Sequence, residues 1–156
     1  MRKFIPILIL LFLPSTALPY EHSCYLLTLS DADSGRLIYS ACLYDGECLT
    51  YDWKNSLYGL NVTEVFSVWN GSLVLMEIVY HDPHGNPEPL ADPDDLEYLC
   101  HQGGPFRATN VSKAYAEISL MVGRVGKPRV SVRDRTVDLD SEVGFGGRVI
   151  LRISRS

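Results

Sequence analysis

The sequence predicts a single all-β domain, either an antiparallel β-sandwich or a partly closed barrel, with one long Pro- and Asp-rich loop. Short apolar-rich segments recur along the chain, Gly, Asp and Asn residues separate them, and no stretch keeps a helical period. The chain has 156 residues, of which 46% are hydrophobic and 21% charged. These values suit one packed core and exclude a disordered, collagen-like or coiled-coil chain.

The first half of the chain predicts five strands, each ended by turn-forming residues. The sequence Ser-Asp-Ala-Asp-Ser-Gly separates the first two strands, and Asp45-Gly46 precedes the third. Asn70-Gly71 supplies the two positive φ angles of a type I′ turn, so the fourth and fifth strands form the most clearly predicted hairpin. The five strands are Cys24 to Leu29, Arg36 to Cys42, Glu47 to Trp53, Thr63 to Trp69 and Ser72 to His81.

The second half begins with a different kind of segment. Asp82 to Glu97 holds four prolines and six acids, so we expect a long surface loop with a short helical turn near Asp92-Pro93. Gly144 to Gly147 predicts a bend before the last strand. Four more strands follow the loop: Ala114 to Val122, Pro128 to Arg133, Arg135 to Leu139 and Arg148 to Ile153.

The N-terminus has the pattern of a signal peptide. Arg2 and Lys3 precede an apolar run, and Ser15-Thr16-Ala17 places small residues where signal peptidase cleaves. We expect residues 1–17 to be removed and residues 18–156 to form one exported domain that is secreted, periplasmic or on the cell surface. An uncleaved anchor is disfavoured, because the run is shorter than the roughly 20 residues that span a bilayer.

Four cysteines in an exported chain favour two disulfides. Cys42 and Cys48 flank the Asp45-Gly46 turn, so they can meet across a hairpin, which leaves Cys24 to pair with Cys100. Cys24 with Cys42 is the competing pair, since both lie at equal distance from the turn at Asp33. The sequence leaves the pairing open.

Three sequence triplets fit the acceptor pattern for N-glycosylation. They begin at Asn61, Asn70 and Asn110, and they follow an export signal. We therefore predict these asparagines as glycosylation sites wherever the source has the machinery.

Charge and motif content disfavour several function classes. The net charge of −5 argues against nucleic acid as a partner. Pro83 keeps His81 and His84 from sharing a regular face, so we expect no metal site there despite the nearby Asp92, Asp94 and Asp95. No cofactor is predicted. We also expect no enzymatic activity, because no Gly-x-Ser-x-Gly motif occurs and disulfide pairing removes the cysteine nucleophiles.

An ordered set of segments resembles one exported family. The set comprises the stretch 51–64, the hairpin 65–80 and the sequence Ile-Ser-Leu-Met-Val-Gly-Arg-Val at 118–125. Together they resemble domain of unknown function eighteen-fifty, whose genes often lie beside TAXI-type TRAP transporter permeases. The resemblance implies an exported all-β accessory domain, with a membrane transporter or its solute-binding protein as partner.

The family's His-Ser-Val triplet and a following Glu correspond here to Asn55-Ser56-Leu57 and Glu64, so Asn55 replaces the histidine. We predict Asn55, Ser56 and Glu64 as polar contacts of a binding surface, with local turn capping as the alternative. Aromatic residues nearby suit either an interface or the core. They are Tyr51, Trp53, Tyr58, Phe66 and Trp69.

The function expected from the sequence is therefore an exported accessory or binding domain for an unknown small ligand, working with a TRAP-type transporter. A cell-surface structural or adhesive subunit is the alternative, and a secreted hydrolase is a distant third.

Overall fold

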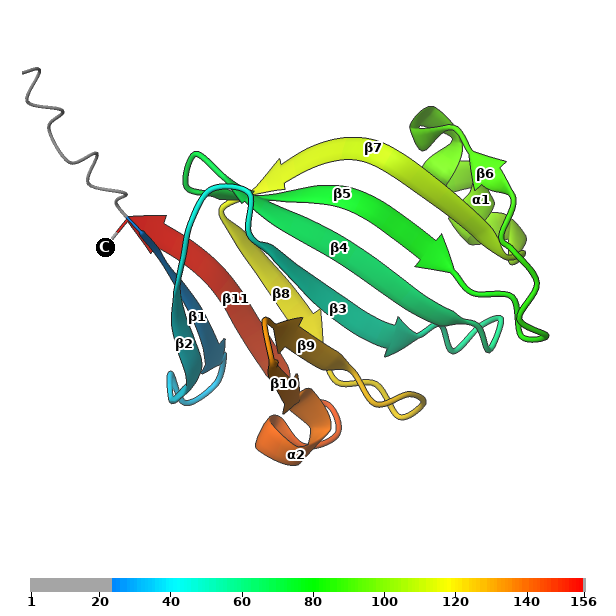
Figure 1. Ribbon diagram of the computed structural model, residues 1–156. Helices are drawn as coiled ribbons and strands as arrows, with labels where there is room; N and C mark the ends of the chain where they lie inside the picture. The colour runs from blue at the N-terminus through cyan, green and yellow to red at the C-terminus, as the bar shows by residue number, and fades with distance from the viewer. Residues whose placement is uncertain (1–23, 156) are drawn as a thin grey trace, which may run out of the picture.

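The computed structural model describes residues 24–155, which form two β-sheets packed against each other (Figure 1). The smaller sheet has four strands in the order β2-β1-β11-β8, and the larger has seven in the order β10-β9-β3-β4-β5-β7-β6. The two sheets stay separate instead of closing into a barrel. Of the two predicted architectures, the structure therefore confirms the sandwich.

All neighbouring strands run antiparallel except β6 and β7, which are parallel. The smaller sheet contains β1 (Tyr25–Asp31), β2 (Leu37–Leu43), β8 (Glu117–Met121) and β11 (Arg148–Arg155). The larger contains β3 (Cys48–Lys54), β4 (Asn61–Trp69), β5 (Ser72–Tyr80), β6 (Leu90–Ala91), β7 (Phe106–Tyr115), β9 (Arg129–Val132) and β10 (Arg135–Asp138). The helical elements are η1 (Pro93–Asp95), α1 (Leu96–Gln102) and α2 (Leu139–Val143).

Two predicted hairpins are confirmed, β1 with β2 and β4 with β5, and the Asn70-Gly71 turn of the second has φ angles of 48° and 75°. The region after Tyr80 is more structured than predicted. The expected loop contains the two-residue strand β6, which lies at the edge of the sheet. At an edge, the prolines of the surrounding loop interrupt no hydrogen bonds between strands. The strand expected at 114–122 is instead two strands, β7 and β8, which end and begin on either side of Ala116.

The predicted signal peptide and its cleavage site lie outside the described residues. Within residues 24–155, no helix is long and apolar enough to cross a membrane.

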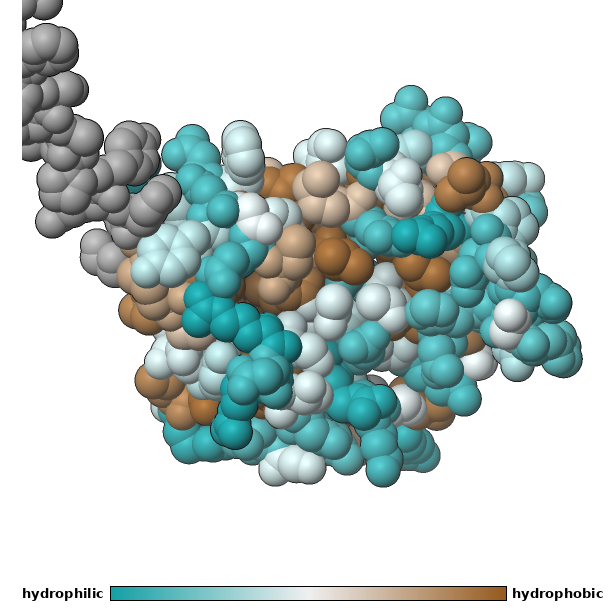
Figure 2. Space-filling model, in the orientation of Figure 1, coloured by the Kyte–Doolittle hydropathy of each residue, from teal (hydrophilic) through white to brown (hydrophobic). Residues whose placement is uncertain are grey.

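Two hydrophobic cores lie on the inner face of the large sheet. The larger core fills the space between the two sheets and includes Leu27, Phe66 and Leu151. The smaller one packs Val62 and Tyr80 against α1 and its neighbours. Figure 2 shows hydrophobic residues in the middle and along the left side of one face, among hydrophilic ones. Trp53 contacts both cores, so it lies where they meet.

The central strands contain β-bulges, and the number of extra residues at the bulge increases from β4 through β5 to β7. Val65 and Phe66 are consecutive in β4 and pair with Glu77 and Leu75, so Met76 is an extra residue in β5. Glu77 and Leu75 pair in turn with Thr109 and Lys113, so β7 has three residues, 110–112, where β5 has one. Such bulges bend and twist a sheet. These bulges lie near the boundary between the two cores.

The disulfide joins Cys24 to Cys42, with their Cα atoms 5.5 Å apart, while Cys48 and Cys100 are free. The preferred pairings of Cys42 with Cys48 and of Cys24 with Cys100 are therefore wrong, and the competing pairing is confirmed. The Asp45-Gly46 turn does not close a hairpin. It carries the chain from β2 in one sheet to β3 in the other, which separates Cys42 from Cys48.

Candidate functional site

Asn55 opens the turn that follows β3, and its side chain stabilises that turn. Its Oδ1 accepts hydrogen bonds from the backbone N–H groups of Leu57, at 2.9 Å, and Tyr58, at 3.1 Å. Its carbonyl oxygen accepts from the N–H of Gly59 at 2.8 Å. These contacts match the turn-capping alternative for Asn55. Ser56 is exposed at the tip of the same turn.

Glu64 lies on the inner face of β4, beside Trp53. The indole Nε1 of Trp53 donates to Glu64 Oε1 at 3.0 Å. Burial raises the pKa of the Glu64 carboxyl, and the indole hydrogen bond offsets part of that effect. Burial and the nearby Glu64 charge together raise the pKa of Tyr51 to about 12.

The structure brings two of the three predicted polar contacts to one side chain. Burial is the main reason why the pKa of the Tyr80 phenol is raised, and Cys100 and the Glu64 charge add to it. The Asn55 side chain acts on the pKa of the same phenol in the opposite direction. Asn55 and Glu64 therefore both lie close enough to Tyr80 to influence its pKa, whereas Ser56 is exposed.

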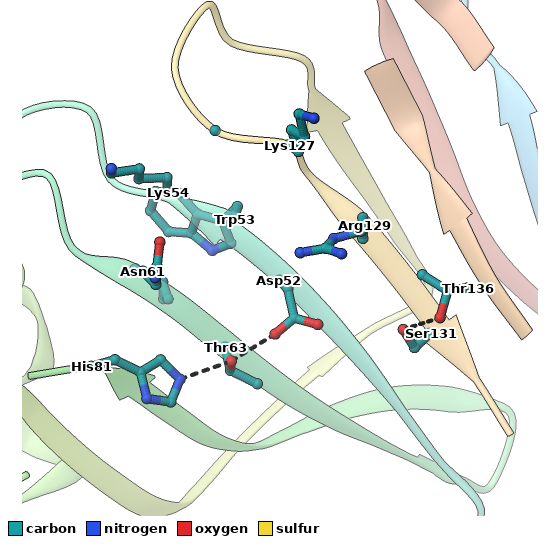
Figure 3. Close-up of a pocket in the computed structure, with 12 residues that line it drawn as sticks. Asp52, Trp53, Lys54, Asn61, Thr63, His81, Lys127, Arg129, Ser131 and Thr136 are labelled. Atoms are coloured by element: carbon teal, nitrogen blue, oxygen red, sulfur yellow. Dashed lines mark hydrogen bonds between the residues drawn. The ribbon is translucent and has the colours of Figure 1, made fainter. Parts of the chain in front are cut away.

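A polar groove of about 450 Å³ lies on the opposite, outer face of the large sheet (Figure 3). Side chains alternate between the two faces of a strand, so the neighbours of the inward-facing Tyr51, Trp53 and Val62 point into this groove. Sequence reasoning did not identify it. Its principal polar residues are Asp52, Lys54, Thr63, His81, Lys127 and Arg129.

A chain of hydrogen bonds crosses the floor of the groove. The Thr63 hydroxyl donates to Asp52 Oδ1 at 2.7 Å and lies 3.0 Å from His81 Nε2. His81 Nδ1 lies 3.2 Å from Glu88 Oε1. When His81 is protonated, Thr63 and Glu88 accept from its two ring N–H groups. Backbone N–H groups, with His81, lower the pKa of Glu88.

Three cations of the groove have side chains without a partner among the described residues. The side chains of Lys54, Lys127 and Arg129 make no hydrogen bond or ion pair within residues 24–155. Asp52 is the register partner of Arg129, yet the two side chains form no ion pair. Figure 3 shows Arg129 extending across β3 between Trp53 and Asp52. By contrast, five other arginines each pair with an acid: Arg36, Arg107, Arg133, Arg148 and Arg152.

Gly126 positions one of these cations. It has a φ of 98°, and a Cβ atom built on it would lie 2.7 Å from Lys54 Cβ and 3.1 Å from Lys54 N. Only glycine therefore lets the segment 123–128 cross so close to the end of β3. This close crossing holds Lys127 at the edge of the groove.

The residues considered as metal ligands have other contacts. His81 belongs to the groove floor, while the backbone N–H of exposed His84 donates to Asp82 Oδ1 at 2.8 Å. Asp92 caps η1 by accepting from the N–H of Asp94 at 3.0 Å. In the described part of the chain, no group of three or more His, Cys, Asp or Glu residues could hold a metal ion.

The three predicted glycosylation asparagines are all exposed. Asn70 is in the type I′ turn, and Asn110 begins the three-residue bulge of β7. Asn61 lines the polar groove. A glycan on Asn61 would therefore cover the groove, whereas glycans at the other two positions lie on other elements.

The sequence contains only a weak indication of the groove, namely the alternation of polar and apolar residues within single strands. Asp52 and Lys54 alternate with Tyr51 and Trp53, and Arg129 occupies a polar position of its own strand. Each alternation predicts only a strand with one polar face. The convergence depends on the register that sets Asp52 opposite both Thr63 and Arg129.

No family model matches this chain, and the comparisons with curated proteins and with solved structures found no match. The resemblance drawn from the sequence segments therefore stays a prediction, and the geometry of the groove carries the functional argument.

Proposed function

We propose that this protein is an extracytoplasmic binding domain that captures a small, hydroxylated organic anion in the polar groove. One observation carries the proposal: the side chains of Lys54, Lys127 and Arg129 lie around a hollow without a partner in residues 24–155, on a protein whose net charge is −5. In an acidic protein, unpaired cations gathered at a concave site favour a negatively charged ligand.

The other groups of the groove favour a ligand with hydroxyls. Arg129 offers the planar donor pair that suits a carboxylate. The Ser131 and Thr136 hydroxyls lie 3.0 Å apart and can each bond a ligand hydroxyl. Among residues 24–155 the Asp52 carboxylate accepts only from Thr63, so it has capacity for another donor. A sugar acid or hydroxy acid combines both kinds of group.

The proposed location rests on the signal-peptide pattern, and the Cys24–Cys42 disulfide supports it. Delivery of the anion to a TRAP-type transporter or its solute-binding protein is the finer part of the proposal. It rests on the family resemblance. Co-purification of the native protein with a transporter subunit from membranes would test this part separately.

The binding test is isothermal titration calorimetry of the exported domain with glucuronate, gluconate and malate, and with neutral glucose as the matched control. We expect binding of at least one anion and none of glucose. Arg129→Gln should weaken binding about tenfold, because a charge-assisted hydrogen bond contributes roughly 1.4 kcal/mol or more.

Arg155→Gln is the control for net charge. Arg155 is an exposed cation on β11, outside the groove, so its loss should leave the affinity unchanged. The proposal fails if none of the three anions binds, or if Arg129→Gln and Arg155→Gln have the same effect.

A further inference from the structure

A second hollow of about 460 Å³ lies on the other side of the 123–128 segment, against the inner face of β3. The turn after β3 and residues 121–128 enclose it. Trp53 and Lys54 line both this hollow and the polar groove, and the other lining residues of the two differ. The proposed function does not use this hollow, which we call the aromatic cleft.

Two stacked aromatic rings line the cleft. The rings of Tyr51 and Trp53 have centroids 6.4 Å apart and planes inclined by 21°. Trp53 also makes an edge contact with Tyr80, at 6.3 Å, and donates its indole N–H to Glu64. These contacts fix the Trp53 ring, so the cleft presents a preorganised apolar surface.

Exposed apolar side chains surround this aromatic lining. Leu57 is 76% exposed, Met121 is 66% exposed and Val125 is 47% exposed, and all three line the cleft. They come from three separate parts of the chain: the turn after β3, the end of β8 and the 123–128 segment. Exposed to this degree, they contribute little to the core, so their convergence favours a ligand with an apolar body.

The charges at the cleft have one sign. Lys54 and Arg124 are its cations, and no acidic residue among residues 24–155 lines it. The Arg124 guanidinium lies 5.2 Å from the ring centroid of exposed Phe145, which holds it beside the cleft. Glu64 lies behind Trp53, on the side that bonds the indole.

We infer that the aromatic cleft binds a small molecule with an apolar, aromatic body and a single anionic group. The volume is within the usual range for small-molecule sites, and the lining combines apolar walls with few polar groups. The apolar body packs on Tyr51 and Trp53, with Leu57, Met121 and Val125 around it. The anionic group faces Arg124.

The test uses two probes that differ by one charged group. 1-Anilinonaphthalene-8-sulfonate has an apolar aromatic body with a sulfonate, and N-phenyl-1-naphthylamine has the same body without it. The protein carries Trp69→Phe, since Trp53 and Trp69 are its two tryptophans and Trp69 lies at the distant hairpin turn. Trp53 then reports binding through loss of its emission.

We expect saturable one-to-one binding of the sulfonate probe that quenches Trp53. Arg124→Gln should weaken binding of the sulfonate probe about three- to fivefold, which is the effect of one exposed charge pair. It should leave the affinity for the neutral probe unchanged. Leu57→Ser should weaken both probes about fivefold, because it removes apolar contact area. Both positions are exposed, and thermal melts would verify that the variants fold.

Arg129→Gln separates this inference from the proposed function. It should leave both probes unaffected, and a polar anion bound in the groove should not displace them. The inference would be overturned if the probe did not quench Trp53 emission, or if Leu57→Ser did not change the affinity for the probes. Full displacement by a groove anion would also overturn it, because the two hollows would then act as one site.

Discussion

The side-chain oxygen of Asn55 accepts two backbone N–H groups that would otherwise lack a partner in the turn after β3. Asn55→Ala should therefore destabilise the protein by about 1–2 kcal/mol. Ser56→Ala should change stability by less than about 0.5 kcal/mol, because Ser56 is exposed. Urea denaturation of both variants measures this difference. Asn55→Asp, which keeps the acceptor, should recover much of the loss, and equal effects of the two alanines would contradict the capping role.

Glu64 gives a pH-dependent prediction. Burial raises the pKa of its carboxyl above the ordinary 4.5, so the folded state holds this proton more tightly than the unfolded state. The buried charge thus destabilises the fold at neutral pH, and the penalty disappears as the pH falls below the ordinary value. Glu64→Gln keeps an oxygen for the Trp53 indole and removes the charge.

Glu64→Gln should therefore melt at a higher temperature than the wild type at pH 7, with a difference that shrinks on acidification. Thermal melts between pH 4 and 8 measure it. Glu97→Gln on α1 is the control, because Glu97 is an exposed carboxylate in no ion pair within residues 24–155. A constant difference across that pH range would show that something other than the buried charge is responsible.

At the scale of elements, Gly103 lets the end of α1 pack closely against the turn after β3. It ends α1 with a φ of 75°, and a Cβ atom built on it would lie 2.1 Å from a ring carbon of Tyr58. Tyr58 also donates its hydroxyl hydrogen to the carbonyl of His101. Gly103→Ala should therefore destabilise the protein by about 1–3 kcal/mol, combining overpacking with backbone strain.

Two other glycines provide matched controls for this substitution. Gly104 has no atom within 4 Å of a built Cβ and no positive φ, so Gly104→Ala should change stability by less than about 0.5 kcal/mol. Gly35 has a φ of 71° in open space, so Gly35→Ala isolates the backbone strain. If Gly103→Ala costs no more than Gly35→Ala in chemical denaturation, the Tyr58 contact is not tight.

The sequence predicted those elements whose information is local. The Asn70-Gly71 hairpin and the start of β3 follow from turn chemistry, and β4 follows from alternation. The bulges did not follow, although β5 holds a trace of one: its core residues Leu73, Leu75, Ile78 and Tyr80 are spaced by two, three and two positions. A strict strand alternates by two, so the gap of three marks the extra residue Met76.

The candidate site shows the same limit. Asn55 and Glu64 were predicted as polar contacts of a binding surface, and in the structure Asn55 caps the turn after β3 while Glu64 accepts from the Trp53 indole. The groove depends on strand register, on the segment 123–128 and on Gly126, none of which a single stretch of sequence encodes. The helix α2 also went unpredicted, since five residues are too few to establish a helical period.

At the scale of the whole molecule, one disulfide and two thiols give a direct prediction. Under non-reducing conditions the intact mass should correspond to one disulfide, and native alkylation should label Cys48 before the partly buried Cys100. Replacing both Cys24 and Cys42 by Ser should cost about 3 kcal/mol through the closed loop, whereas Cys48→Ser should cost little. A second disulfide in the folded protein would contradict this assignment.

The three-residue bulge of β7 affects how the chain tolerates changes of length. Removing Met76 leaves the remaining residues of β5 in strict alternation, because Leu75 and Glu77 already face opposite sides. The same holds for removal of residues 110–112 from β7. In β5, losing a second residue would turn the core residues of half the strand toward solvent, so at Met76 a deletion of one residue is milder than a deletion of two. In β7, losing two of the three residues leaves one residue opposite Met76, so the pairing with β5 becomes one-to-one and the bulge can shorten without a change of face.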